Sequence, residues 1–304
     1  MPDRSVQCCI TSPPYWGLRD YGVAGQLGLE TTPEEYVEHI VEVFREVWRV
    51  LRDDGTLWLN LGDSYASGGR GGGGSYTDER KAWHAQSEVR GWRSALAGLK
   101  NKDLVGIPWR VAFALQADGW YLRSDIIWAK TNCMPESVTD RPTRSHEYLF
   151  LLSKSKRYYY DHEAIKEPAV NGDPNQPRGS IGVIDNPLNG SRRKQDGVGK
   201  RTYDGFNARY QPVAKRNKRD VWTVPTSAYE EAHFATFPPA LIEPCILAGA
   251  PENGIVLDQF NGAGTTGLVA TRLGRRYIGI ELNSAYVAMS ERRIISDAPL
   301  LNTL

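Results

Sequence analysis

Apolar strands alternate with helical segments at both ends of this 304-residue chain. The first block contains an apolar run at 6–11, a predicted helix at 33–51 and a second strand at 56–60. The last block, from about residue 233, is predicted to run helix, strand, helix, strand, helix. Strands that alternate with helices form a mostly parallel sheet covered on both faces. The sequence therefore predicts an α/β fold.

Turn and capping residues set the expected boundaries of these elements. Thr32 is a good N-cap, Pro33 suits the first helical position, and Glu35 completes a capping box. A turn at 53–55 is expected before the strand at 56–60. Further along, the pattern predicts a helix at 103–116, a strand at 124–128 and a hairpin at 147–160.

Two stretches in the middle of the chain differ from the rest in composition. Residues 64–100 include a run of glycines at 68–74 and are predicted to be a mobile surface insertion. Residues 161–220 are rich in Gly, Pro and Asn, and the part from 191 to 220 has ten Lys and Arg against three Asp. The net charge of the whole chain is only +1, so this local excess is the electrostatic feature that favours a polyanionic partner.

A strand, a glycine turn, a helix, a second strand and an acid follow one another near the C-terminus. The strand at 255–258 leads into Gly262 and Gly264, and the strand at 277–281 ends in Glu281. A Gly-x-Gly turn alone equally suits a tight strand-to-helix turn with no ligand. The whole series, with an acid about 20 residues after the glycines, is typical of a site for an adenosine-bearing ligand. The glycines do not say which ligand it is.

The loop at 11–16, Thr-Ser-Pro-Pro-Tyr-Trp, follows the first apolar strand. Its two prolines hold an extended backbone, which can fix a hydroxyl, a carbonyl and an aromatic face in one geometry. That arrangement suits a planar base with an amino group. On its own, Ser-Pro-Pro-Tyr is more often a structural turn. The glycine series elsewhere in the same chain favours a functional site.

Together these residues resemble the amino DNA methyltransferases, which modify N4 of cytosine or N6 of adenine. The loop at 11–16 is similar to their catalytic motif, S/D/N-P-P-Y/F/W, and residues 258–266 to their S-adenosylmethionine (SAM) motif. Residues 233–238 resemble the segment that contacts the methionine part of SAM. Supporting stretches match at 51–63, 125–130 and 141–154. The order, with the catalytic motif first and the SAM motif last, is that of the β group.

The resemblance implies a doubly wound, mostly parallel, seven-stranded Rossmann-like SAM-methyltransferase sheet with an irregular target-recognition insertion. Residues 1–160 form the catalytic half of the domain, 161–220 the basic variable target-recognition region, and 221–304 the SAM-binding half. One departure is Gln259, which replaces a proline usual in the family and is expected to have little effect.

The resemblance also implies the site residues. The catalytic residues are Ser12, Pro13, Pro14 and Tyr15. The cofactor-binding residues are Phe237, Pro238, Asp258, Phe260, Gly262, Gly264, Thr265, Thr266 and Glu281. The basic side chains expected to contact DNA phosphates are Arg192, Arg193, Lys194, Lys200, Arg201, Lys215, Arg216, Lys218 and Arg219, although any one of them could equally be a solvated loop charge. SAM is the expected cofactor, and no metal is expected.

The expected reaction is methylation of double-stranded DNA at a flipped base. Serine at position 12 is typical of the N4-cytosine enzymes and aspartate of the N6-adenine enzymes, so cytosine N4 is favoured. An N6-adenine enzyme is the alternative, and a non-catalytic DNA-binding protein with this fold is less favoured. The protein is expected in the cytoplasm, without a membrane segment, as a monomer or homodimer. A cognate restriction nuclease is a candidate partner.

Overall fold

The computed structural model describes residues 1–66, 98–133, 135–169, 214–227 and 237–297. The chain divides into two compact units, one formed by Met1–Ala164 with Arg219–Leu304 and the other by Ile165–Lys218. The predicted insertion at 64–100 and the variable region at 161–220 therefore lie largely outside the described residues. None of the described helices is both long enough and apolar enough to cross a membrane.

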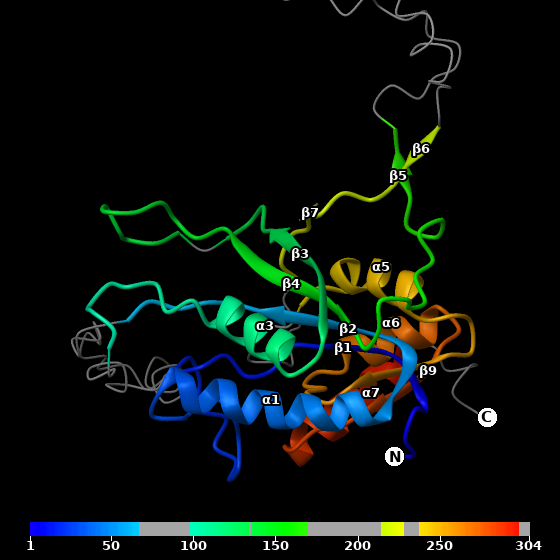
Figure 1. Cartoon of the computed structure of the whole chain (residues 1–304), viewed down its shortest axis with the longest axis horizontal. Helices are drawn as coiled ribbons and strands as arrows, with labels where there is room; N and C mark the ends of the chain where they lie inside the picture. The colour runs from blue at the N-terminus through cyan, green and yellow to red at the C-terminus, as the bar shows by residue number, and fades with distance from the viewer. Residues whose placement is uncertain (67–97, 134, 170–213, 228–236, 298–304) are drawn as a thin grey trace, which may run out of the picture. The chain divides into compact units, whose positions relative to one another are not determined.

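Seven strands of the first unit form one sheet in the order β7-β3-β4-β2-β1-β8-β9 (Figure 1). Only β4 runs against its neighbours, because β2 and β3 each pair with it in antiparallel fashion and the other four pairs are parallel. The strands are β1 (Val6–Thr11), β2 (Leu51–Leu61), β3 (Tyr121–Ala129), β4 (His146–Ser153), β7 (Val221–Thr223), β8 (Ile255–Asp258) and β9 (Arg276–Gly279). The predicted mostly parallel, seven-stranded sheet is confirmed.

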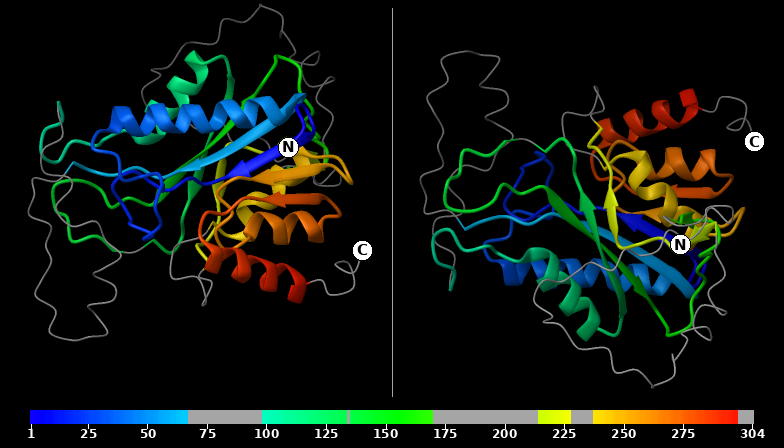
Figure 2. Two further views of the ribbon diagram at one scale, coloured as in Figure 1. Left: turned by 90° about the horizontal axis from the view of Figure 1, so that it is seen from below. Right: turned by 90° about the horizontal axis from the view of Figure 1, so that it is seen from above.

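Helices cover both faces of this sheet, as the alternating pattern predicts. Figure 2 shows α1 and α3 together on one face and α5, α6 and α7 on the other. The helices are α1 (Pro33–Val50), α3 (Ile107–Ala117), α5 (Pro239–Gly249), α6 (Thr265–Arg272) and α7 (Ser284–Asp297). The main apolar core lies between the α1–α3 layer and the central strands, where Phe44, Leu59, Val111 and Phe150 have no exposed surface.

The start of α1 follows directly from its sequence. The Thr32 side chain accepts a hydrogen bond from the Glu35 N–H, and the Glu35 carboxylate accepts one from the Thr32 N–H. This reciprocal pair satisfies two N–H groups that a helix start would otherwise leave without partners. Together with Pro33 it makes the predicted helix accurate to within one residue at each end.

Two of the predicted boundaries that are wrong, the starts of β2 and α3, are set by contacts far along the chain. β2 begins at Leu51, and the expected turn at 53–55 is an irregularity inside that strand, because Val6 pairs with Leu51 but Cys8 with Thr56. α3 begins at Ile107 rather than at 103, after Gly106 in a left-handed conformation with φ 78°. The Asp63 carboxylate caps this helix by accepting hydrogen bonds from the N–H groups of residues 106 and 107.

The hairpin predicted at 147–160 does not form. β4 pairs with β2 and β3, and residues 154–160 contain no strand. Tyr160 instead lies against Trp58 with ring centroids 6.4 Å apart, and the Tyr159 N–H donates to the Asp54 carbonyl. An apolar strand followed by tyrosines has the local pattern of a hairpin, but its partners come from strands elsewhere in the chain.

The second unit contributes a short antiparallel pair of strands among the described residues. β5 (Glu167–Pro168) pairs with β6 (Lys215–Arg216), and the Arg216 guanidinium forms an ion pair with Glu167 at 2.9 Å. This pair joins the two ends of the variable region.

Candidate active site

The carboxyl ends of the parallel strands and the start of β4 meet at one edge of the sheet. β1 and β8 are direct neighbours there, although they come from opposite ends of the sequence. From β1 the chain crosses to β2 on one side, and from β8 it crosses to β9 on the other. Ligands bind at such a point of reversal in α/β sheets. Both predicted motifs begin here, one after each strand.

Asp258 links the two motifs. The Thr11 hydroxyl donates to its Oδ1 at 2.7 Å, the Thr266 hydroxyl donates to its Oδ2 at 2.7 Å, and the Phe260 N–H donates to Oδ1 at 3.1 Å. Asp258 is 1% exposed, and burial raises the pKa of its carboxyl to about 6, although these hydrogen bonds oppose the rise. Its two oxygens thus hold the end of β1 against the start of α6.

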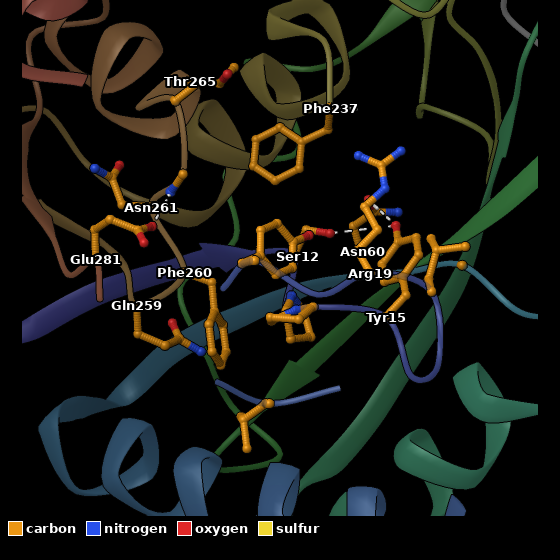
Figure 3. Close-up of a pocket in the computed structure, with 18 of the residues that line it drawn as sticks. Ser12, Tyr15, Arg19, Asn60, Phe237, Gln259, Phe260, Asn261, Thr265 and Glu281 are labelled. Carbon is orange, nitrogen blue, oxygen red and sulfur yellow. Dashed lines mark hydrogen bonds between the residues drawn. The ribbon is translucent and has the colours of Figure 1, made fainter. Parts of the chain in front are cut away.

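A cavity of about 1300 Å³ opens at this edge, lined by residues from both ends of the chain. In Figure 3, Glu281, Asn261 and Phe260 lie to one side and Ser12, Tyr15 and Asn60 to the other, with Phe237 above the space between them. The predicted site residues on its wall are Ser12, Pro13, Pro14, Tyr15, Phe237, Phe260, Gly262, Thr265 and Glu281. Asp258, Gly264, Thr266 and Pro238 do not line it.

The side of the cavity that carries the predicted cofactor-binding residues is built around Glu281. Its Oε2 accepts a hydrogen bond from the Gly262 N–H at 2.8 Å, and its Oε1 accepts one from the Asn283 N–H at 2.9 Å. A carboxylate has about four acceptor sites, so this orientation leaves capacity for two ligand hydroxyls. Gly262 has φ 49°, and the nearest atom to an added Cβ would be 3.9 Å away, so this turn is open towards a ligand. The arrangement fits the ribose of an adenosine-bearing cofactor.

Position 264 requires a glycine for a different physical reason from the one that the sequence suggests. Gly264 is the N-cap of α6 with φ 73°, and an added Cβ would lie 2.6 Å from the Cβ of Ser290 on α7. Its missing side chain therefore lets α7 pack against the start of α6. Gly264 lies behind the cavity wall. It fixes the position of the start of α6, which forms part of that wall.

The loop at 11–16 is fixed from several sides. Tyr36 of α1 donates from its hydroxyl to the Pro14 carbonyl at 2.9 Å, and the Trp16 indole N–H donates to the Glu30 carbonyl at 2.9 Å. The Tyr15 ring lies directly over Gly62, where an added Cβ would come within 2.4 Å of the ring. Ser12 stays partly exposed at the head of the loop and lines the cavity.

Two polar side chains that sequence reasoning missed bond to the Tyr15 hydroxyl, and a third, Lys130, pairs with one of them. Glu147 Oε2 accepts the hydrogen bond of this hydroxyl at 2.7 Å, Asn60 Oδ1 lies 3.1 Å away, and the Glu147 carboxylate is ion-paired with Lys130. Burial, followed by the neighbouring Glu147, raises the pKa of Tyr15 well above its usual value, so the hydroxyl keeps its proton.

A signal for these residues exists in the sequence. Asn60 is a polar residue near the end of the apolar run 57–61, Lys130 follows the strand at 121–129, and Glu147 stands at the start of an apolar strand. Because the ends of these buried strands meet at one edge of the sheet, the polar residues on them lie close together there. What the sequence does not give is the strand order that brings these three together. Gln259 and Asn261 also line the cavity, beside the predicted Phe260.

The basic side chains predicted to contact DNA fall into two groups. Arg192, Arg193, Lys194, Lys200 and Arg201 lie outside the described residues. Lys215 and Arg219 are exposed, Lys218 is half-buried, and Arg216 is held in its ion pair with Glu167.

The sheet and its two-motif cavity define an amino DNA methyltransferase. The chain belongs to the N6/N4 family of DNA methylases, whose profile matches residues 6–292. The expected family is thereby confirmed, and the expected methyl donor of this family is SAM.

Among curated relatives, the chain is 50% identical over 289 residues to the type II methyltransferase M.SmaI of Serratia marcescens, which covers 95% of this chain and 84% of that protein. It is 48% identical over 294 residues to M.Cfr9I of Citrobacter freundii, covering 97% and 83%.

Solved structures share the fold at low sequence identity. PvuII DNA methyltransferase, described as cytosine-N4-specific, matches with a TM-score of 0.59 and 18% identity over 99% of this chain and 87% of its own. A DNA modification methylase of Thermus thermophilus, solved with SAM, matches with a TM-score of 0.57 and 21% identity over 99% and 89%.

Proposed function

We propose that this enzyme transfers the methyl group of SAM to N4 of a cytosine flipped out of double-stranded DNA. The observation that carries the proposal is the shared cavity, in which the Ser12–Tyr15 loop faces the Glu281 and Phe260 wall across the Thr11–Asp258 link. Serine at position 12 favours cytosine, and the cytosine-N4-specific PvuII enzyme has the same fold.

Glu281 is proposed to hold the ribose hydroxyls of SAM, with Phe260 beside the adenine and Phe237 towards the methionine part. When bound, SAM supplies a methyl group on a good leaving group, the sulfonium. An aromatic amine is a weak nucleophile because its lone pair is delocalised into the ring. The Ser12 hydroxyl and the Pro13 carbonyl are proposed to accept hydrogen bonds from the two N–H groups of this amine. These hydrogen bonds would favour a pyramidal nitrogen with an exposed lone pair.

The remaining residues of the loop position the base. The Tyr15 ring, held over Gly62, is the proposed stacking face for the flipped cytosine, which unstacks at a cost of about a few kcal/mol. Catalysis then rests mainly on alignment of the amine with the methyl group, and positioning of this kind supplies large rate factors. The nitrogen–carbon bond would form as the sulfur–carbon bond breaks, and the methylated nitrogen would release one of its two protons to water.

Tritium transfer from labelled SAM to unmethylated genomic DNA, followed by nucleoside chromatography, tests the reaction and the target base together. We expect the label in N4-methylcytosine. Label in N6-methyladenine would replace the proposal with the alternative enzyme. DNA without label would favour a protein that keeps the fold and binds DNA without turnover.

The basic residues at the C-terminal end of the variable region are proposed to contact DNA phosphates, in keeping with the type II methyltransferases among the relatives. A companion restriction nuclease is proposed on the same basis. Phosphate contacts set affinity and its dependence on salt, whereas base-edge contacts set sequence preference.

Neutralising Lys215, Lys218 and Arg219 together is expected to weaken DNA binding, with the slope of log K against log salt reduced by up to about 3, because each lost phosphate contact removes about 0.9. Arg216 is left in place since it holds Glu167. The matched control is Lys156→Ala with Arg157→Ala. Both residues are exposed, follow the C-terminal end of β4 and do not line the cavity. An unaltered slope in the triple variant, measured by titration at several salt concentrations, would show that these residues do not contact DNA.

A further inference from the structure

The Tyr15 side chain is fixed at both of its ends by groups from different strands. Its ring rests on Gly62 after β2, where no side chain would fit. Its hydroxyl donates to Glu147 at 2.7 Å and lies 3.1 Å from Asn60 Oδ1. The Asn60 amide in turn donates to the Tyr148 carbonyl at 3.0 Å, so it is oriented by β4.

Glu147 is the centre of this arrangement. One carboxylate oxygen accepts hydrogen bonds from the Tyr15 hydroxyl and, at 3.3 Å, from the Asn60 amide. The other oxygen accepts a hydrogen bond from the Lys130 ammonium. The side chains of Lys130 and Glu147 are 19% and 16% exposed, so solvent screens their attraction only in part. Lys130 also stands 4.4 Å from the centre of the Trp128 ring, a cation–π contact that limits its movement.

We propose that Glu147 is a positioning residue for methyl transfer: it acts through the Tyr15 hydroxyl to fix the plane of the ring on which the target base stacks. Lys130 neutralises the carboxylate, so the Glu147–Lys130 pair adds no net charge to the cavity that is proposed to hold the cationic methyl donor. The inference rests on the proposed stacking role of Tyr15.

The backbone of Glu147 is held independently of its side chain. Residue 147 pairs with Trp128 in the ladder between β3 and β4. Removing the carboxylate therefore leaves the sheet in place and takes away the nearer acceptor of the Tyr15 hydroxyl, which keeps the more distant Asn60 Oδ1 at 3.1 Å. A displacement of a reacting group by about 1 Å can cost about a hundredfold in rate.

A double-mutant cycle on the full-length protein tests whether Glu147 acts through Tyr15. Single-turnover rate constants for methyl transfer to DNA are measured for Tyr15→Phe, Glu147→Ala and the double variant, with SAM and DNA affinities measured separately. We expect about a tenfold loss or more in each single variant, no further loss in the double variant, and both affinities within about threefold of wild type. Losses that multiply in the double variant would overturn the proposal.

Rescue separates positioning from the mere presence of an ion pair. Lys130→Met with Glu147→Gln removes both charges but keeps an amide oxygen for the tyrosine hydroxyl, so its rate is expected within about threefold of wild type. A rate as low as that of Glu147→Ala would contradict a positioning role. If Glu147→Ala alone is unstable because Lys130 is left unpaired, the cycle is run in the Lys130→Met background.

The outcomes distinguish this inference from the proposed function. Full activity in Glu147→Ala alongside an inactive Tyr15→Ala would remove only the role of Glu147. Full activity in Tyr15→Ala would remove the stacking role itself.

Discussion

Replacing Tyr15 with alanine is expected to abolish methyl transfer, with a loss of about a thousandfold or more, while SAM still binds. The substitution removes the proposed stacking face and leaves the Glu147 and Asn60 groups without the hydroxyl that they hold. Stacking on an aromatic side chain contributes about 1–3 kcal/mol per base, and misalignment of the amine adds to that loss. Tritium transfer measures the rate, and calorimetry measures SAM affinity.

Tyr15→Phe is the matched control because it keeps the ring and removes only the hydroxyl. It is expected to retain measurable turnover. Near-normal turnover in Tyr15→Ala would mean that the ring is only part of the packing around Gly62, and the catalytic assignment of this loop would be lost.

Replacing Gly264 with valine is expected to reduce SAM affinity by at least about a hundredfold. A left-handed conformation costs a residue with a Cβ about 1–2 kcal/mol, and more for a β-branched one. The new Cβ would also meet Ser290 at 2.6 Å, so the start of α6 and the packed α7 must separate. Gly262 and Thr265, on either side of residue 264, line the cavity and would move with it.

Gly274→Val provides the control for backbone strain alone. Gly274 also has a left-handed φ, 68°, but nothing lies within 4 Å of an added Cβ. We expect this variant to lose some thermal stability and to bind SAM with nearly normal affinity. Unchanged SAM affinity in Gly264→Val would show that the turn before α6 does not form the cofactor site.

The sequence predicts best what is decided locally. The capping box of α1 and the apolar runs of β1 and β8 are complete within a few residues, and these elements match. The strand–glycine–helix series also predicts the open turn at Gly262 and the carboxylate of Glu281 beside it, because the whole series is contiguous in the chain. The strand before Glu281 ends earlier than predicted, at Gly279.

What depends on strand order could not be predicted from local pattern. The cap of α3 comes from Asp63, and the partner of the Tyr15 hydroxyl comes from the start of β4. Asp258 looks like a ligand contact in the motif, yet its oxygens face Thr11 and Thr266 inside the fold. Only the adjacency of β1 and β8 turns that carboxylate into a link between the two ends of the chain.

The central claim is that one cavity holds both the methyl donor and the target base. A crystal structure of the enzyme with the SAM analogue sinefungin and a DNA duplex containing its methylation site tests this directly. We predict the analogue on Glu281 and Phe260 and a flipped cytosine on Tyr15, with its exocyclic nitrogen against Ser12 and about 3–3.5 Å from the transferring group. An analogue bound elsewhere, or a base that never reaches the Ser12–Tyr15 loop, would contradict the account.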